Sequence, residues 1–198
     1  MTGIDMKVNI AGVELKNPVA VASGTFGFGH EYNNFYSLNE LGAICVKGLT
    51  VKRREGNPPP RIAETPAGIL NSVGLQNPGV DSFIANDMPF LRQFDIKIIA
   101  NISGNTIDEY CEMAEKVSAA GVDMIELNIS CPNVRAGGMA LGIKPANVEE
   151  VTCLCKGALK KTPLIVKLSP NVESIAVNAQ AAERGGADCI SLINTLTG

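Results

Sequence analysis

Residues 106–128 read TIDEYCEMAEKVSAAGVDMIELN and hold one complete helix-to-strand unit. Thr106, followed three residues later by Glu109, is a capping box that starts a helix, and Gly121 stands where a glycine ends one. Residues 124–128 then form a short apolar run of the length of a buried strand. The stretch predicts a helix that returns directly into a parallel sheet. The apolar face of that helix consists of Tyr110, Met113, Ala114 and Val117.

The same unit recurs along the chain. Glycine followed by an apolar strand appears again at 42–44 and 186–188, as expected if helix-to-strand turns repeat around a barrel. Further helices are predicted at about 147–159 and 172–184. The fold class is therefore α/β, with one parallel sheet. The six expected strands are residues 19–23, 44–48, 97–101, 124–128, 164–168 and 189–194.

Two segments depart from this alternation. A short hairpin of residues 8–10 and 13–15 precedes the first strand, and we expect it to plug the floor of the barrel. Residues 50–79 form a long excursion, and loops of this length in compact domains are usually functional or disordered. Since a parallel barrel carries its catalytic groups on the loops that follow its strands, we expect this loop to fold over a ligand.

Each expected strand has a polar residue at its last position or at the one before it, although strands buried on both faces are usually apolar throughout. The carboxyl ends of parallel barrel strands meet at one rim, so we expect these side chains to share one mouth. Turn chemistry alone accounts equally well for the serine. The six residues are Ser23, Lys47, Asn101, Asn128, Lys167 and Asn194.

The two lysines of this set, Lys47 and Lys167, are harder to explain as turn formers. Each lies in a strand that otherwise belongs to the core, and a buried ammonium is costly unless an anion or a polarised group meets it. One explanation is a structural salt bridge, and the other is an electron-rich ligand. Two lysines at equivalent strand ends favour the ligand.

Two loops carry further candidates. Residues 128–133 read NISCPN, so Cys131 lies between polar neighbours just after the fourth strand, whereas a lone cysteine is most often an inert buried thiol. Residues 71–77 read NSVGLQN and offer consecutive backbone N–H groups as a cradle for a carboxylate; a plain glycine turn explains them equally well. His30 is the only histidine, and we expect it in an exposed loop.

Composition excludes several classes of protein. The 198 residues are 45% hydrophobic and 19% charged, which is typical of one globular domain. The net charge of -3 leaves no basic excess for nucleic acid. No apolar run approaches the roughly 18 residues of a membrane span, which favours a cytoplasmic protein without membrane contact. The six cysteines contain no C-x-x-C pair, so we expect reduced thiols and no metal site.

Taken together, these stretches resemble class 1 dihydroorotate dehydrogenases, and more closely the 1B branch that works beside an iron–sulfur flavoprotein subunit. NISCPN at 128–133 and VKLSP at 166–170 are the most specific matches, because they seldom occur together elsewhere. The other matches follow in family order across nearly the whole chain. They are ASG at 22–24, FGFG at 26–29, VKGLT at 46–50, REGNP at 54–58, residues 71–78 and 126–134, and INT at 193–195.

The resemblance implies a TIM (β/α)8 barrel that binds FMN and oxidises (S)-dihydroorotate to orotate in de novo pyrimidine synthesis. Cys131 would be the general base that takes the C5 proton while a hydride leaves C6 for the flavin. Lys167 would lie at the N1–O2 edge of the flavin and stabilise its reduced form. The implied flavin-binding residues are Ser23, Lys47, Gly48, Asn101, Asn128, Lys167 and Ile193. The implied substrate-binding residues are Lys47, Asn71, Val73, Gly74, Leu75, Asn128, Asn133, Asn194 and Thr195.

The resemblance also implies partners. Electrons would pass to a subunit with FAD and a 2Fe–2S cluster and then to NAD, in a heterotetramer built on a homodimer. The chain departs from the family in length, because it stops after about six of the eight βα units, and the missing loops would bind the flavin phosphate. We interpret residues 1–198 as a single incomplete flavin-binding barrel domain. The alternatives are another FMN barrel, such as a dihydropyrimidine dehydrogenase-like enzyme, and a non-catalytic truncated remnant.

Overall fold

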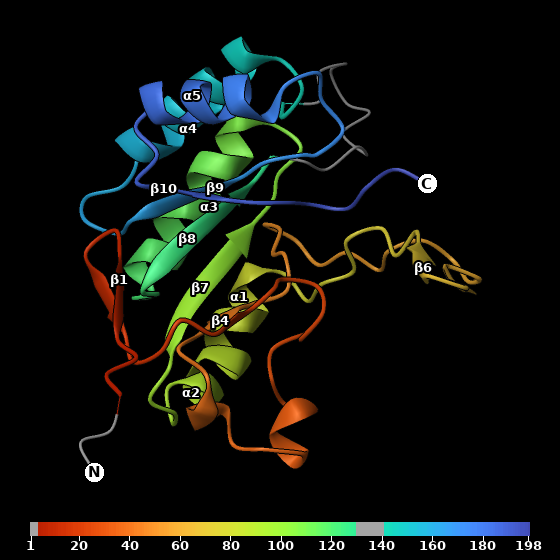
Figure 1. Ribbon diagram of the computed structural model, residues 1–198, viewed down its shortest axis with the longest axis vertical. Coiled ribbons are helices and arrows are strands. Elements are labelled where there is room, and N and C mark those ends of the chain that lie inside the picture. Colours follow the sequence, from red (N-terminus) through yellow and green to blue (C-terminus); the bar gives the residue numbers. More distant parts are fainter. Residues whose placement is uncertain (1–3, 130–140) are drawn as a thin grey trace.

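A six-stranded parallel sheet forms the centre of the computed structural model, which describes residues 4–129 and 141–198 (Figure 1). Its order is β10-β9-β8-β7-β4-β3, so neighbouring strands follow one another along the chain, as the sequence predicts. The strands are β3 (Ala20–Val21), β4 (Ala43–Cys45), β7 (Lys97–Ile102), β8 (Met124–Asn128), β9 (Leu164–Lys167) and β10 (Cys189–Ser191).

The first, second and sixth strands are shorter than the sequence predicts. Beyond β4, the N–H of Val46 still donates to Ile99 at 3.0 Å, but the N–H of Lys47 donates to Gly27 in the preceding loop at 3.0 Å. Beyond β10, only single bonds continue the pairing, such as Asn194 N–H to the carbonyl of Leu168 at 3.1 Å. The regular ladders therefore end where the chain turns to build the rim.

The long helices form where the sequence predicts them, and the first begins at its predicted signal. In α3 (Ile107–Ala119) the side chain of Thr106 accepts from the N–H of Glu109, which confirms the predicted cap. The reciprocal half of the capping box differs, because the Glu109 side chain accepts from the N–H of Asn105. The next helix is α4 (Pro145–Gly157). The last, α5 (Ile175–Arg184), starts later than predicted because Ser174 caps it. A continuous helical segment comprises α1 (Val80–Ser82), η3 (Phe83–Asp87) and α2 (Met88–Leu91), and two short turns are η1 (Tyr32–Asn34) and η2 (Leu38–Glu40).

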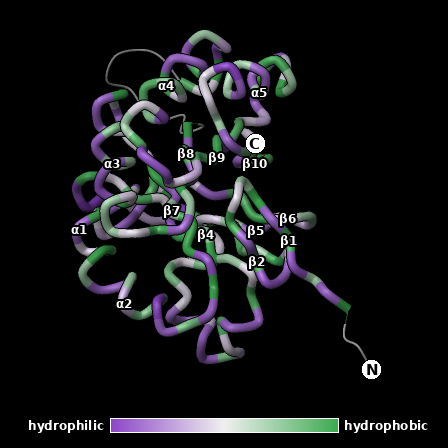
Figure 2. Tube along the Cα trace, turned by 90° about the vertical axis from the view of Figure 1, so that its left-hand side faces the viewer, coloured by the Kyte–Doolittle hydropathy of each residue, from purple (hydrophilic) through white to green (hydrophobic). Residues whose placement is uncertain are grey.

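The sheet separates two apolar clusters. One face packs against the long helices, whose residues alternate between hydrophilic and hydrophobic along their length (Figure 2). The opposite, inner face carries a smaller cluster that includes Leu15 from the hairpin of β1 (Val8–Ile10) and β2 (Val13–Leu15). The hairpin thus closes the inner face at one end, as predicted. The inner cluster is Leu15, Ala43, Cys45, Ile99, Met124 and Ile165, with Val8, Ile10, Val13 and Cys189 packed against it.

Two aspartates at helix-to-strand junctions tie neighbouring strands together. Asp123 accepts the N–H of Ile98 at 2.9 Å, and Asp188 accepts the N–H of Leu164 at 2.7 Å. Each also pairs with a cation, and for Asp188 this is Lys156 at 2.5 Å. Since the backbone donor belongs to the adjacent strand, each carboxylate fixes the register of one strand pair.

The excursion at residues 50–79 contains an antiparallel hairpin that the sequence analysis did not predict. Its strands are β5 (Ile62–Thr65) and β6 (Gly68–Asn71), and every residue in both is exposed. Figure 1 shows it projecting from the body of the molecule. Within the described residues, every helix is too short or too polar to span a membrane.

Candidate active site

On the inner face of the sheet, a layer of polar side chains lies next to the apolar cluster, nearer the carboxyl ends of the strands. Strand residues alternate between faces, so the positions two residues after Ala43, Ile99, Met124 and Ile165 also point inward. Those positions hold Cys45, Asn101, Glu126 and Lys167, and Ser191 takes the same place after Cys189. We call these five residues the Glu126 cluster. All five come from different strands of the sheet.

Glu126 is the centre of this cluster and is only 6% exposed. One oxygen, Oε1, accepts from Asn101 Nδ2 at 2.5 Å and from Cys45 Sγ at 3.2 Å, and it lies 3.6 Å from Lys167 Nζ. The other oxygen, Oε2, accepts from Ser191 Oγ at 2.8 Å. Lys167 therefore has a buried ion-pair partner, so the salt-bridge explanation holds for this lysine alongside any role toward a ligand.

Glu126 was missed because the sequence analysis considered only the last polar residue of each strand. Its signal was available in the two-residue periodicity, since Glu126 shares a face with Met124 and Asn128. Its charge also acts on the thiol next to it. Burial, and then the charge of Glu126, raise the pKa of Cys45 well above its ordinary value, so Cys45 stays a neutral donor.

The predicted asparagines of the rim form one hydrogen-bonded chain. Asn128 Nδ2 donates to Asn101 Oδ1 at 3.3 Å, and Asn194 Nδ2 donates to Asn128 Oδ1 at 2.9 Å. The N–H of Thr195 donates to Asn194 Oδ1 at 2.8 Å. The structure therefore brings together four predicted site residues from three separate βα units, and Lys167 joins them through Glu126.

Lys47 stands apart from the cluster. Its side chain is half-buried, and its pKa is lowered by burial and then by the charge of Arg61. Within residues 4–129 and 141–198, no carboxylate forms an ion pair with Lys47. Because an ammonium in such surroundings favours an anionic partner, Lys47 is the described residue best prepared to receive one.

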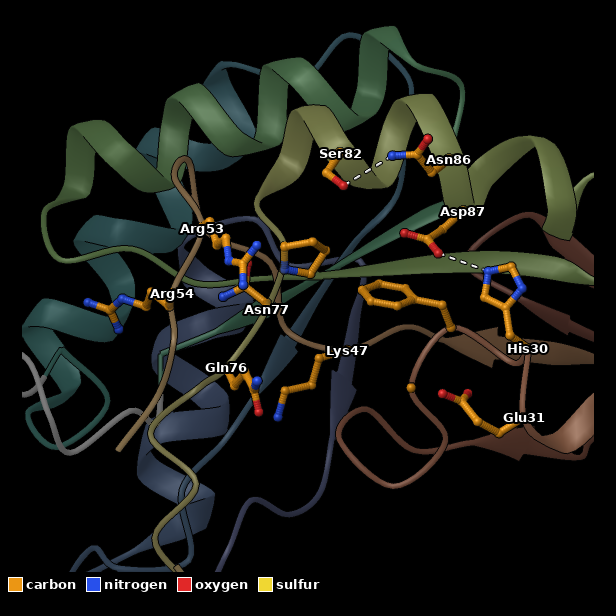
Figure 3. Close-up of a pocket in the computed structure, with 13 residues that line it drawn as sticks. His30, Glu31, Lys47, Arg53, Arg54, Gln76, Asn77, Ser82, Asn86 and Asp87 are labelled. Atoms are coloured by element: carbon orange, nitrogen blue, oxygen red, sulfur yellow. Dashed lines mark hydrogen bonds and ion pairs between the residues drawn. The ribbon is translucent and has the colours of Figure 1, made fainter. Parts of the chain in front are cut away.

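A cavity of about 630 Å³ opens beside Lys47. Figure 3 shows Lys47 and Gln76 near each other at its edge, with His30 and Asp87 on another wall. His30 Nε2 lies 2.9 Å from Asp87 Oδ1, and the imidazole stacks on Phe90; its side chain is half-exposed, as predicted. The cavity reaches the predicted site only at Lys47, whereas the amide chain and the Glu126 cluster lie on the inner face of the sheet.

The predicted carboxylate cradle is held against the sheet by Asn77, which the sequence analysis did not assign to the site. The buried side chain of Asn77 donates to the carbonyl of Leu75 at 2.8 Å and accepts from the N–H of Thr50 at 3.2 Å. Gly74 and Leu75 both have positive φ, at 76° and 55°. A β-carbon at Gly48 would lie 2.8 Å from both Leu75 Cδ1 and Asn101 Oδ1, so only glycine fits there.

The remaining predicted residues differ in placement. Asn71 is exposed in β6, and within the described chain its side chain makes no hydrogen bond. Ile193 is 43% exposed, and Ser23 is half-buried. Cys131 and Asn133 lie outside the described residues. Among the described residues, no three His, Cys, Asp or Glu side chains gather as metal ligands would.

Comparison with known proteins gives a consistent set of relatives. A family model described as dihydroorotate dehydrogenase matches residues 5–198. A protein from Alkaliphilus metalliredigens named dihydroorotate dehydrogenase B (NAD(+)), catalytic subunit, is 63% identical over 198 residues, which cover 100% of this chain and 65% of that protein. A protein of the same name from Thermoanaerobacter sp. is 58% identical over 195 residues, 98% of this chain and 64% of that protein. The chain thus spans about 65% of the length of these relatives.

A solved structure supports the fold. The crystal structure of DHODH in complex with ferulenol from Eimeria tenella superposes with a TM-score of 0.75 at 21% identity. The match covers 97% of this chain and 60% of that chain. The six-stranded sheet is accordingly part of a TIM barrel, as predicted.

Proposed function

The chain belongs to the dihydroorotate dehydrogenase family, and we propose that it oxidises (S)-dihydroorotate to orotate with bound FMN in pyrimidine synthesis. One observation carries this proposal. Two lysines and a connected chain of asparagine amides occupy the inner face and rim of the sheet, where a flavin and a planar pyrimidine both find partners. The names of the relatives support the same activity.

The residues present fit a flavin. The isoalloxazine ring has a polar edge that alternates acceptors and a donor, and the asparagine amides supply both kinds of group. The absence of a side chain at Gly48, between Asn101 and Leu75, leaves the backbone accessible at the rim. When bound, FMN supplies a hydride acceptor. We propose that Lys167 lies at its N1–O2 edge, and that Ser23, Lys47, Gly48, Asn101, Asn128 and Ile193 complete its site.

The substrate would lie on the same rim. We propose that Lys47 and the backbone of residues 73–75 receive the carboxylate of dihydroorotate, since Lys47 is half-buried without an ion pair in the described chain. Amides suit the imide-like edge of the ring because one amide both donates and accepts. The side chains proposed to orient the ring are Asn71, Asn128, Asn133, Asn194 and Thr195.

Cys131 would remove the proton. As the C6 hydride leaves, the C5 proton passes to the thiolate of Cys131, and the remaining electron pair forms the C5–C6 double bond of orotate. A thiol with an ordinary pKa of about 8.5 suits a base near neutral pH. This assignment rests on the NISCPN stretch at residues 128–133.

The name of the relatives also guides the choice of partner. Because they are called NAD(+)-linked catalytic subunits, we propose that electrons leave FMN for a second subunit with FAD and a 2Fe–2S cluster and end on NAD. We further propose that two copies of the catalytic chain form the centre of a heterotetramer in the cytoplasm.

Anaerobic reduction of FMN tests the proposed function. FMN with an excess of the chain should lose its oxidised absorption after addition of dihydroorotate and keep it after addition of dihydrouracil. Free FMN with dihydroorotate is the control and should remain oxidised. Reduction by dihydrouracil alone would instead favour a dihydropyrimidine dehydrogenase-like enzyme, and reduction by neither substrate would favour a non-catalytic protein.

A further inference from the structure

A buried carboxylate, Glu126, lies directly beside the lysine that the proposed function assigns to the flavin. We propose that Glu126 is a positioning residue that holds Lys167 and Asn101 in place and offsets the charge of Lys167, and that it thereby sets how strongly the site prefers reduced over oxidised flavin. This inference rests on the proposed function, because it takes FMN as the ligand of Lys167.

The contacts of Glu126 single it out as the organising residue of the inner face. It lies on β8, in the middle of the sheet, and contacts one side chain from each of β4, β7, β9 and β10. Two of those neighbours, Cys45 and Ser191, are neutral donors. The other two, Asn101 and Lys167, are residues proposed to touch the flavin. Movement of the Glu126 carboxylate would therefore move both.

A structural role alone does not account for a charge at this position. The inward positions beside it hold Met124 and Ile165, which pack without polar partners, and a buried ion pair is often no more stable than apolar residues of similar size. The carboxylate also contacts both residues proposed for the flavin site. Asn101 Nδ2 lies 2.5 Å from Oε1, and Lys167 Nζ lies 3.6 Å from the same oxygen.

The charges of Lys167 and Glu126 predict the direction in which each substitution changes the preference for reduced flavin. The cation of Lys167 favours the electron-rich reduced flavin, and the anion of Glu126 opposes it. Glu126→Gln removes the anion but keeps an oxygen that accepts from Asn101, and its amide NH2 can donate to the Ser191 hydroxyl. It should therefore increase the preference for reduced flavin. Lys167→Met should decrease that preference. A residue that only supports the fold would weaken both forms of the complex together.

The experiment measures the affinity of the 198-residue chain for oxidised FMN and for dithionite-reduced FMN by anaerobic calorimetry. The ratio of the two affinities is the readout. We expect Glu126→Gln to raise the ratio about tenfold, equivalent to about 30 mV for a two-electron couple, and Lys167→Met to lower it by about as much. Glu149→Gln, on α4, makes the same change of charge in an exposed ion pair with Arg184 of α5, and it should leave the ratio unchanged.

The outcomes separate this inference from the proposed function. An unchanged or lower ratio in Glu126→Gln, with Lys167→Met still lowering it, would overturn the role of Glu126 alone. Failure of the unmodified chain to bind either form of FMN would overturn the proposed function and this inference with it. If Glu126→Gln does not fold, the double variant Glu126→Gln/Lys167→Met leaves no unpaired buried charge. It should recover most of the ratio lost in Lys167→Met, and no recovery would contradict the proposal.

Discussion

Lys47 and Lys167 occupy similar strand ends but have different neighbours. Lys167 is 9% exposed and faces Glu126, which compensates its charge within the protein. Lys47 has burial and the like charge of Arg61 against it, and no ion pair in the described chain. An anionic ligand would offset both effects on the ammonium of Lys47. We therefore assign the substrate carboxylate to Lys47 and the N1–O2 edge of the flavin to Lys167.

Replacement of Lys47 should affect binding and stability in opposite directions. Lys47→Met should weaken orotate binding by roughly 10 to 100-fold, the usual value of a charge-assisted hydrogen bond, and should weaken FMN binding by less. It should also raise the melting temperature of the unliganded chain, because the buried charge is removed. Fluorescence titration with orotate and thermal unfolding measure the two effects. A weaker complex with lower stability would show instead that Lys47 supports the fold.

The lowered pKa of Lys47 predicts a pH dependence. The folded chain holds this proton less tightly than the unfolded chain, so the stability of the unliganded chain should rise as pH increases from the lowered pKa toward the ordinary 10.5. Orotate affinity needs the protonated amine and should fall over the same range. Titrations of Lys47→Met should lose both trends, and their persistence would point to another group.

Cys131 carries the proposed proton transfer, and its replacement should slow only that step. Cys131→Ser should bind FMN normally but reduce it with dihydroorotate roughly 10² to 10⁴-fold more slowly at neutral pH, because serine is a much weaker base. Stopped-flow reduction under anaerobic conditions gives the rate. Cys153→Ser, at an exposed cysteine of α4, is the matched control. Equal rates for the two variants would remove Cys131 from the mechanism.

At the residue scale, the sequence predicted the rim better than the layer beneath it. Asn101, Asn128 and Asn194 were found because polar residues at the ends of apolar strands are conspicuous, whereas Thr195 came from the family resemblance; the four form one connected chain. Glu126 was missed because it lies inside its strand, where only the alternation of faces reveals its direction. The roles of all these site residues remain predictions, and Cys131 and Asn133 also lie outside the described residues.

At the scale of elements, local signals set the helices and junctions more firmly than the strand ends. The Thr106 and Ser174 caps fix where α3 and α5 begin. Strand ends depend on contacts between distant segments, such as the bond from Lys47 to Gly27, which no local pattern contains. The β5–β6 hairpin was not predicted because it buries no face and so lacks the apolar alternation that marks a strand.

The aspartate at the start of β10 provides a prediction at this scale. Asp188→Ala removes the acceptor of the Leu164 N–H and should lower the free energy of unfolding by about 1–3 kcal/mol, the cost of an unsatisfied buried donor. Urea denaturation measures it. Asp81→Ala is the control, because Asp81 is an exposed partner of Lys116 at 3.6 Å, and it should cost at most about 1 kcal/mol. Equal costs would mean that Asp188 acts only as a surface charge.

At the scale of the whole molecule, the inner face of the sheet is apolar at one end and polar at the other. The β1–β2 hairpin packs on apolar residues at the floor of the inner face, and the polar layer and rim lie at the opposite end. This polarity is that of TIM barrels, whose active sites lie at the carboxyl ends of the strands. We therefore propose that the flavin binds at this rim.

Hydrogen exchange measured by mass spectrometry, with and without FMN, tests that claim most directly. FMN should slow exchange in the segments that follow the strands and leave the β1–β2 hairpin unchanged, because only the rim carries the proposed ligand partners. The segments expected to be protected are residues 22–30, 46–50, 168–171 and 192–197. Protection of the hairpin with no change in these rim segments would contradict the account.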